Sequence, residues 1–181
     1  MNKRVEAAIN DQIKKEASSS QYYLAMASWA ENNGLNGTAK FMYTHSDEER
    51  FHMLKLVKFV NERGGTAIIP SIDQPPVKFN DLKNVFELLL EHEIGVTASI
   101  NNLVDICLQE KDYTTHNFVQ WEQERNKHTR TRLQIDASQT AKQLSRGYVR
   151  SLTSGGEGLS GGSVDCAPLF LFVCTDALPL L

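Results

Sequence analysis

Cysteine is scarce in this 181-residue chain, which has only Cys107, Cys166 and Cys174. None of them forms the closely spaced pair that is typical of a structural zinc site. An odd number of cysteines also argues against a framework of disulfide bonds. We therefore expect neither a zinc-ribbon fold nor a small secreted fold held together by disulfides.

The chain also lacks a strong excess of one charge, a leader-like start and a long apolar run. Its formal net charge of -3 predicts no nucleic acid and no anionic membrane as partner. The charged start MNKRVEAAINDQIKKE is unlike a signal peptide. The apolar stretch APLFLFVCTDALPLL is too short to span a membrane and contains Asp176. We expect a soluble, cytoplasmic protein.

Buried-type side chains that recur every three or four residues predict three long helices. These are expected over about 3–33 and 35–62, and from a cap at Asn80 or Asp81 to about 111. A fourth helix is expected to begin at TTHNFVQW. The three stripes are Val5, Ile9, Gln12, Glu16, Ser19, Tyr23, Met26 and Ala30; Leu35, Ala39, Met42, His45, Glu49, His52, Leu56 and Val60; and Leu82, Phe86, Leu89, Glu93, Val96, Ile100, Leu103 and Cys107.

Proline is absent from these helical patterns but frequent in the stretch TAIIPSIDQPPVKF, where Pro70, Pro75 and Pro76 exclude a helix. The stretch is long for a link between adjacent antiparallel helices. It has the right length to cross a bundle and join two parallel helices. We therefore predict an all-α four-helix bundle over 1–150 with one long crossover between helices 2 and 3. A Gly/Ser-rich linker and an apolar tail are expected over 151–181.

Three glutamates, Glu16, Glu49 and Glu93, fall near the middle of these stripes together with His52. A glutamate at the edge of a stripe can reach water, but a buried carboxylate needs a partner. Three such glutamates, with a histidine at Glu-x-x-His spacing, favour a buried site. Since no Lys or Arg occupies the stripes, we expect metal ions to supply the positive charge.

The types of ligand narrow the choice of metal. Carboxylates with one imidazole suit iron or manganese, and the absence of thiolates argues against structural zinc. Glu49 and His52 project from the same face of a helix and can reach one ion. Because only one Glu-x-x-His is present, an asymmetric pair of positions bridged by Glu49 is predicted. Tyr23 falls on the same face as Glu16, either as a packed core side chain or as a partner of the ligands.

Four segments, EASSSQYYLAM, HSDEERFHM, EHEIGVTASIN and QEKDYTTHNFVQW, resemble the prokaryotic non-haem ferritins over about residues 3–121. The resemblance implies a ferritin-like four-helix bundle and a homo-oligomeric shell of 24 subunits in the cytoplasm. It also implies intracellular iron storage with ferroxidase activity, in which oxygen or peroxide oxidises Fe(II) to Fe(III) that is stored as mineral.

The resemblance further implies how iron is held, with two ions per subunit and a possible third. Carried over to this sequence, the first iron would be bound by Glu16, Glu49 and His52, and the second by Glu49 and Glu93, with Tyr23 close to both. Glu48 would match a ligand of a third iron site on the inner surface.

After Trp121 the sequence departs from the family. There the family has a Tyr-Val pair, then Glu-Gln, then a run of glutamates, whereas this chain has WEQERNKHTRTR. If three residues are missing, Gln123 matches the ligand of the second iron; without a gap, Asn126 and Thr129 stand at the ligand positions. A change of reading frame or a fusion would account for the departure. Resequencing tests this hypothesis, which requires a family-like helix in a neighbouring frame.

Several alternatives follow from this departure and from the incomplete ligand set. The chain could be a non-catalytic iron-binding or structural subunit with an impaired ferroxidase centre, or a subunit that assembles poorly. An enzyme of the rubrerythrin or manganese-catalase type would need a second Glu-x-x-His, which is missing. A haem ligand at Met53 is conceivable, but a core methionine is the more common role.

Overall fold

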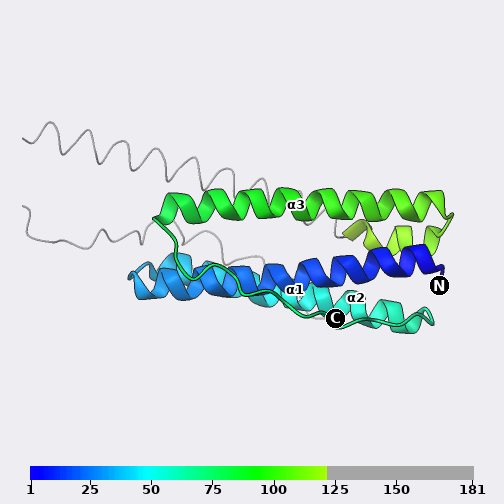
Figure 1. The fold of residues 1–181 in the computed structure, drawn as a ribbon, viewed down its shortest axis with the longest axis horizontal. Coiled ribbons are helices and arrows are strands. Elements are labelled where there is room, and N and C mark those ends of the chain that lie inside the picture. Colours follow the sequence, from blue (N-terminus) through cyan, green and yellow to red (C-terminus); the bar gives the residue numbers. More distant parts are fainter. Residues whose placement is uncertain (122–181) are drawn as a thin grey trace, which may run out of the picture.

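The computed structural model describes residues 1–121, which form an all-helical bundle (Figure 1). α1 spans Lys3–Asn32, α2 spans Asn36–Glu62 and α3 spans Leu82–Gln109, and a shorter helical segment occupies 113–121. No strand occurs in this part of the chain. The predicted all-α bundle is confirmed, and the expected helices match the observed bounds to within about two residues.

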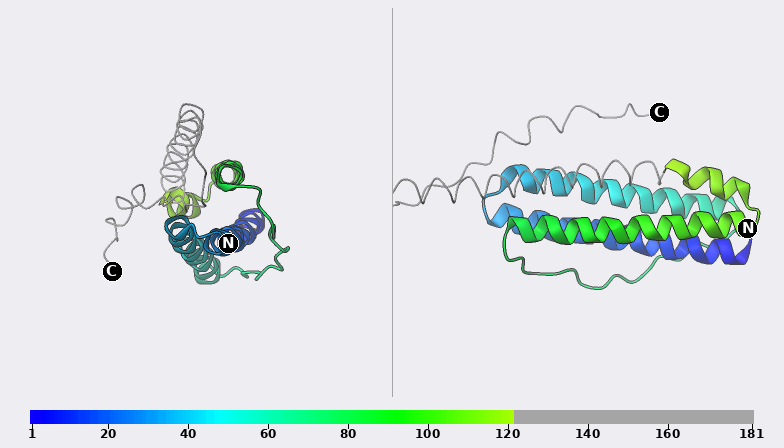
Figure 2. Two further views of the ribbon diagram at one scale, coloured as in Figure 1. Left: turned by 90° about the vertical axis from the view of Figure 1, so that its left-hand side faces the viewer. Right: turned by 90° about the horizontal axis from the view of Figure 1, so that it is seen from above.

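The directions of the helices follow the predicted topology. α1 and α2 are antiparallel, α2 and α3 run in the same direction, and segment 113–121 turns back beside α3 (Figures 1 and 2). The chain after α2 therefore has to travel the length of the bundle before α3 begins, as the prolines predicted. Within residues 1–121, no helix is both long enough and apolar enough to cross a membrane.

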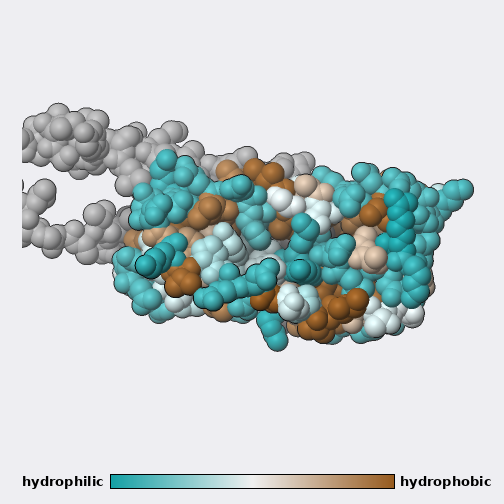
Figure 3. Space-filling model, in the orientation of Figure 1, coloured by the Kyte–Doolittle hydropathy of each residue, from teal (hydrophilic) through white to brown (hydrophobic). Residues whose placement is uncertain are grey.

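The crossover lies on the outside of the bundle and exposes apolar side chains. Ile68, Ile69 and Val77 are largely exposed. Figure 3 shows brown apolar areas on an otherwise mainly hydrophilic face that includes the path of the crossover. At its far end Phe79 is buried and meets the edge of the Trp29 ring, with 5.8 Å between ring centroids. The crossover is thus anchored to the bundle just before α3 begins.

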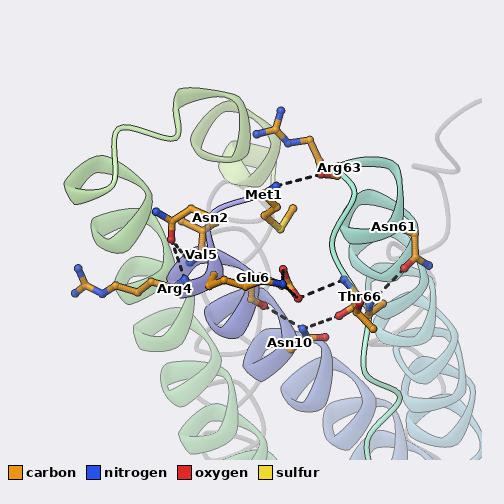
Figure 4. Close-up of polar contacts among 11 residues, drawn as sticks. Met1, Asn2, Arg4, Val5, Glu6, Asn10, Asn61, Arg63 and Thr66 are labelled. Carbon is orange, nitrogen blue, oxygen red and sulfur yellow. Dashed lines mark hydrogen bonds and ion pairs between the residues drawn. The ribbon is translucent and has the colours of Figure 1, made fainter.

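The start of the crossover is held by side chains of α1 (Figure 4). Asn10 donates from Nδ2 to the Thr66 carbonyl oxygen at 3.0 Å and accepts at Oδ1 from the Ile68 N–H at 2.7 Å. Glu6 Oε1 accepts from the Thr66 N–H at 3.3 Å. Irregular backbone needs such partners because it has no ladder of its own. The Asn10 amide therefore pairs with the crossover much as a neighbouring strand would.

All three long helices end in the same hydrogen-bonded turn, in which one residue adopts a positive φ. That residue is Gly34 after α1 and Gly64 after α2, each with φ 72°, and Lys111 after α3 with φ 55°. The closing bonds run from Leu35 N–H to Ala30 O, from Gly65 N–H to Val60 O and from Asp112 N–H to Cys107 O, each 2.9 Å. Glycine therefore occupies the positive-φ position at two of these ends, and a lysine occupies it at the third.

Asp112 starts the last helical segment. Its Oδ1 accepts from the Thr115 N–H at 3.0 Å, its Oδ2 accepts from the Thr115 hydroxyl at 2.8 Å, and Arg63 Nη2 donates to Oδ1 at 3.2 Å. Burial raises the pKa of Asp112, but the Thr115 donors and the Arg63 guanidinium together lower it below its ordinary value of 3.8. This side chain therefore both caps the segment and ties it to the end of α2.

The interior of the bundle has two apolar clusters. Apolar cluster 1 consists of Val5, Ile9, Ile13, Leu56, Phe59, Val60, Leu103, Val104, Cys107 and Val119. Apolar cluster 2 consists of Tyr23, Met26, Ala27, Phe41, Met42, Phe79, Val85, Phe86 and Leu89. Along α1, α2 and α3 the residues of one cluster precede those of the other, so the clusters occupy opposite ends of the bundle. Burial at both ends is the main source of stability.

Between the two clusters lies a group of buried polar side chains that we call the polar belt: Gln12, Glu16, Ser19, Ser20, His45, Ser46, Glu49, His52 and Glu93. Part of it joins α1 to α2. Ser20 donates to the Ser46 carbonyl oxygen and Ser46 donates to the Ser20 carbonyl oxygen, both at 2.8 Å. Small hydroxyl side chains let the two helices approach closely here and satisfy their own polar atoms.

Candidate metal centre

Glu16, Glu49 and His52 come together in the polar belt. One ligand atom from each lies within 4.8 Å of the others. Glu16 is 0% exposed, Glu49 1% and His52 6%. Glu16 comes from α1, and the other two come from one face of α2, where i and i+3 positions are neighbours. The three residues that the stripes placed on buried faces are therefore brought to one point.

Glu93 approaches this region from α3 and is also buried. The Tyr23 hydroxyl donates to Glu93 Oε1 at 2.8 Å, which fixes one carboxylate oxygen. Glu93 is not part of the group whose ligand atoms lie within 4.8 Å. Glu93 is thus hydrogen-bonded to Tyr23 but is not one of the three residues of the compact group.

The buried polar residues of the described chain include three glutamates and two histidines, but no lysine or arginine. Taking a carboxylate out of water is costly, and several of them in one low-dielectric region make the electrostatic potential strongly negative. Oxygen ligands with one imidazole nitrogen form a donor set that suits a hard or borderline divalent cation such as Fe(II) or Mn(II). The residues present therefore fit a metal ion.

His52 has a ring nitrogen that faces Glu49. Its Nδ1 lies 3.8 Å from Glu49 Oε2 and makes no hydrogen bond with residues 1–121. On one side the imidazole meets the Trp121 ring, with 5.2 Å between centroids, and Lys55 Nζ lies 3.6 Å from the centre of that indole. Trp121 therefore shields the imidazole from water and limits its rotation.

His45 packs against two aromatic rings. Its ring contacts Tyr23 and Phe41, with centroid distances of 5.3 Å and 4.0 Å. Its Nδ1 lies 2.9 Å from the Phe41 carbonyl oxygen. Because a carbonyl only accepts, Nδ1 carries the proton. Nε2 is then left to face Glu48 at 3.9 Å.

Glu48 and Glu49 point in different directions although they are neighbours in sequence. Glu49 is buried with the group of three, whereas the side chain of Glu48 is 51% exposed. Glu48 therefore lies away from the compact group. The other predicted ligand, Gln123, lies outside the described residues, as do the alternatives Asn126 and Thr129.

Two polar residues near the centre were not assigned a role from the sequence. Gln12 is 1% exposed and donates from Nε2 to Glu16 Oε1. His92, next to Glu93 in the sequence, is partly buried. For Gln12 the available signal was a polar residue on the buried stripe, one turn before a glutamate.

His92 lines a groove of about 1010 Å³ between α1 and α3 and stacks on Tyr22, with 5.0 Å between ring centroids. Its Nε2 lies 2.7 Å from the Ser19 hydroxyl oxygen. Since Ser19 donates its own proton to the Lys15 carbonyl oxygen, Nε2 is the donor. Burial lowers the pKa of His92, and Lys15 adds to this effect although the charge of Glu49 opposes it.

Comparison with known proteins places this geometry in a family. The family model described as Ferritin-like domain matches residues 6–135. The chain is 42% identical over 121 residues to a protein of Haemophilus influenzae named as a bacterial non-heme ferritin-like protein, which covers 67% of this chain and 73% of the relative. It is 40% identical over 121 residues to the bacterial non-heme ferritin of Campylobacter jejuni, with 67% and 72% covered.

Solved structures agree. Chlorobium tepidum ferritin superposes with a TM-score of 0.76 at 30% identity, covering 85% of this chain and 99% of that chain. An open-pore ferritin of the hyperthermophilic archaeon Archaeoglobus fulgidus gives a TM-score of 0.76 at 33% identity, covering 80% and 88%. A bundle with one long crossover and a buried Glu–Glu–His group, matched over most of its length by such relatives, identifies the chain as a member of the ferritin family.

Proposed function

We propose that this chain binds Fe(II) as a substrate in the polar belt, oxidises it to Fe(III), and stores the product within a homo-oligomeric shell. The observation that carries the proposal is the compact group of Glu16, Glu49 and His52, whose ligand atoms lie within 4.8 Å of one another. Ferritin relatives at 40–42% identity support iron as the metal. The oxygen-rich donor set agrees with that assignment.

The proposed roles are those that the family resemblance implies, and the grouping of Glu16, Glu49 and His52 supports them. Glu16 and His52 bind the first iron, Glu49 bridges, and Glu93 binds the second iron from α3. Tyr23 holds Glu93 by its 2.8 Å hydrogen bond and thereby limits the rotamers open to that ligand. Three buried carboxylates with no buried lysine or arginine among the described residues attract divalent cations electrostatically.

The bound iron supplies the redox chemistry: two Fe(II) ions give up one electron each, which with two protons reduce dioxygen to hydrogen peroxide. The chain itself supplies position and environment. Trp121 covers the His52 imidazole and keeps water from it. Apolar cluster 1 and apolar cluster 2 close the belt at both ends, so the carboxylates act in a low dielectric.

Finer features remain proposals drawn from the family. We assign Glu48, exposed beside His45, to a third iron site, and we assign the chain to a 24-subunit shell in the cytoplasm. Gln123 is the proposed further ligand of the second iron. The division into a bundle over 1–150 and a linker with an apolar tail over 151–181 is also a prediction, because it concerns residues after Trp121.

A second candidate is a subunit that binds iron without oxidising it rapidly. It is favoured by one observation: Glu93 is not in the compact group of ligand atoms, so only the first position has three ligands among residues 1–121. A single bound Fe(II) can give only one electron, and rapid reduction of dioxygen needs its partner. In this case the first position would retain its ion while oxidation stayed slow.

The test adds Fe(II) in air to the purified protein and follows Fe(III) absorbance, with native size measured in parallel. We expect a rapid phase that is lost in Glu49→Gln and kept in Glu62→Gln, which changes an exposed carboxylate of the same helix. Oxidation no faster than in buffer, together with tight Glu49-dependent Co(II) binding, would favour the second candidate. An absence of Glu49-dependent metal binding would overturn both.

A further inference from the structure

Gln12 is a buried amide in a place where apolar packing would be expected. It lies on α1 at 1% exposure, between Ile9 and Ile13 of apolar cluster 1 and one turn before Glu16. Glutamine is seldom fully buried, and each of its polar atoms needs a partner when it is. Apolar packing therefore does not explain why a glutamine occupies position 12.

The orientation of this amide is determined by its neighbour. Nε2 donates to Glu16 Oε1, and the reverse orientation would set the amide oxygen against a carboxylate oxygen, which only accepts. The amide oxygen, Gln12 Oε1, is buried and accepts no hydrogen bond from the described residues. The amide N–H group thus donates to Glu16, whereas the buried amide oxygen without a hydrogen bond lowers the stability of the folded chain.

We propose that Gln12 is a positioning residue for the metal centre, an inference that rests on the proposed function. Its N–H occupies one oxygen of Glu16, fixes the rotamer of that side chain and presents the other oxygen toward Glu49 and His52. A hydrogen bond to an ionised group in a low dielectric is stronger than one between neutral groups. The carboxylate is thereby held in place before an ion arrives, so less order has to be gained on binding.

If Gln12 positions Glu16, its replacement should weaken metal binding without lowering the stability of the metal-free chain. A purely structural role predicts instead that stability falls. Replacing Gln12 by leucine removes the buried acceptor that lacks a partner and extends apolar cluster 1. The folded apoprotein should therefore be as stable as the original, or more stable. Binding at the Glu16–Glu49–His52 position should nevertheless weaken, because Glu16 loses the donor that orients it.

The experiment measures Co(II) binding by titration calorimetry and by visible absorption, and thermal unfolding without metal, in the full chain. We expect Gln12→Leu to bind Co(II) about tenfold more weakly, with an altered visible spectrum, at an unchanged or higher unfolding temperature. Gln12→Met, which keeps an unbranched side chain, should behave in the same way. Gln21→Leu, at an exposed position of the same helix, should bind as the original does.

The result that would overturn the inference is Co(II) binding by both Gln12 variants with the original affinity and spectrum. So would a loss of affinity that merely follows a lowered unfolding temperature, since that marks a structural role. If the original chain itself shows no Co(II) binding that depends on Glu49, the proposed function fails as well. Normal binding in the original with no effect of Gln12 substitution rejects only the present inference.

Discussion

The apolar ends and the polar belt are built from the same three helices but affect stability in opposite directions. At the ends, side chains such as Ile9, Leu56 and Leu89 are fully buried, each contributing about 1.5–3 kcal/mol to folding. In the belt, Glu16, Glu49 and Glu93 are buried at a cost in desolvation. Apolar burial at the two ends therefore stabilises the folded chain, and the buried polar side chains lie between these ends.

The two ends also differ from each other. Apolar cluster 1 includes Val119 from segment 113–121, so it draws on every helical element of the described chain. Apolar cluster 2 draws on α1, α2, α3 and on Phe79 of the crossover. Among residues 1–121, one end is therefore closed by the fourth helical segment and the other by the crossover.

The largest effect is expected at an apolar end. Leu56→Ala should lower the free energy of unfolding by about 2–5 kcal/mol, because it leaves a cavity in apolar cluster 1. Leu24→Ala, a matched change at an exposed position, should cost no more than about 0.5 kcal/mol. Urea unfolding of metal-free protein measures both values. Equal costs for the two variants would contradict the assignment of cluster 1 as a stabilising core.

In the polar belt, by contrast, we expect bound metal to raise the free energy of unfolding. Co(II) at 100 times its dissociation constant should raise the free energy of unfolding by about 2.7 kcal/mol. In Glu49→Gln this increase should disappear, while the metal-free protein stays at least as stable because a buried charge has gone. Thermal unfolding with and without Co(II) decides the matter. A full metal-dependent increase in the variant would remove Glu49 from the ligand set.

A smaller effect is expected where the belt joins α1 to α2 through neutral hydroxyls. Ser20→Ala and Ser46→Ala should each cost about 1 kcal/mol. The double variant should cost less than their sum, since the two hydroxyls lie 3.2 Å apart and share one contact. Ser28→Ala, at an exposed site of α1, is the control. Strict additivity in urea unfolding would show that the two serines act independently.

The smallest effect concerns the joint between α3 and segment 113–121, at the end that cluster 1 occupies. The pKa of Asp112 is lowered in the folded chain, so its contribution to stability is present above about pH 4 and decreases as the pH falls through the folded value. Asp112→Asn should lower the free energy of unfolding at pH 7 by up to about 1 kcal/mol. This difference should shrink below pH 4. A difference that stays constant down to pH 3 would exclude an ionic contribution.

Much of the fold and the central group could be predicted because they depend on local periodicity. The stripes placed Glu16, Glu49 and His52 on buried faces, and prolines in the range 66–79 determined the crossover. These features follow from the 3.6-residue repeat and from the chemistry of single residues. Neither of them requires knowledge of how the helices are placed against each other.

The features that could not be predicted depend on residues far apart in the chain. Asn10 pairs with backbone more than fifty positions away, and His92 is held by Ser19, 73 positions earlier. The hydrogen bond of Gln12 to Glu16 is local, but its importance appears only once both are known to be buried. Sequence periodicity predicts which face of a helix is buried, but the hydrogen-bond partners of that face are known only once the helices are packed together.

Lys111 and Asp112 have a consequence for the rest of the chain. The Asp112 N–H donates to the Cys107 carbonyl oxygen, and Asp112 Oδ1 accepts from the Thr115 N–H. These two hydrogen bonds lie within nine consecutive residues, 107–115. All of these residues lie within the range 6–135 that the family model matches. The direction in which segment 113–121 sets out is therefore determined by the turn that precedes it.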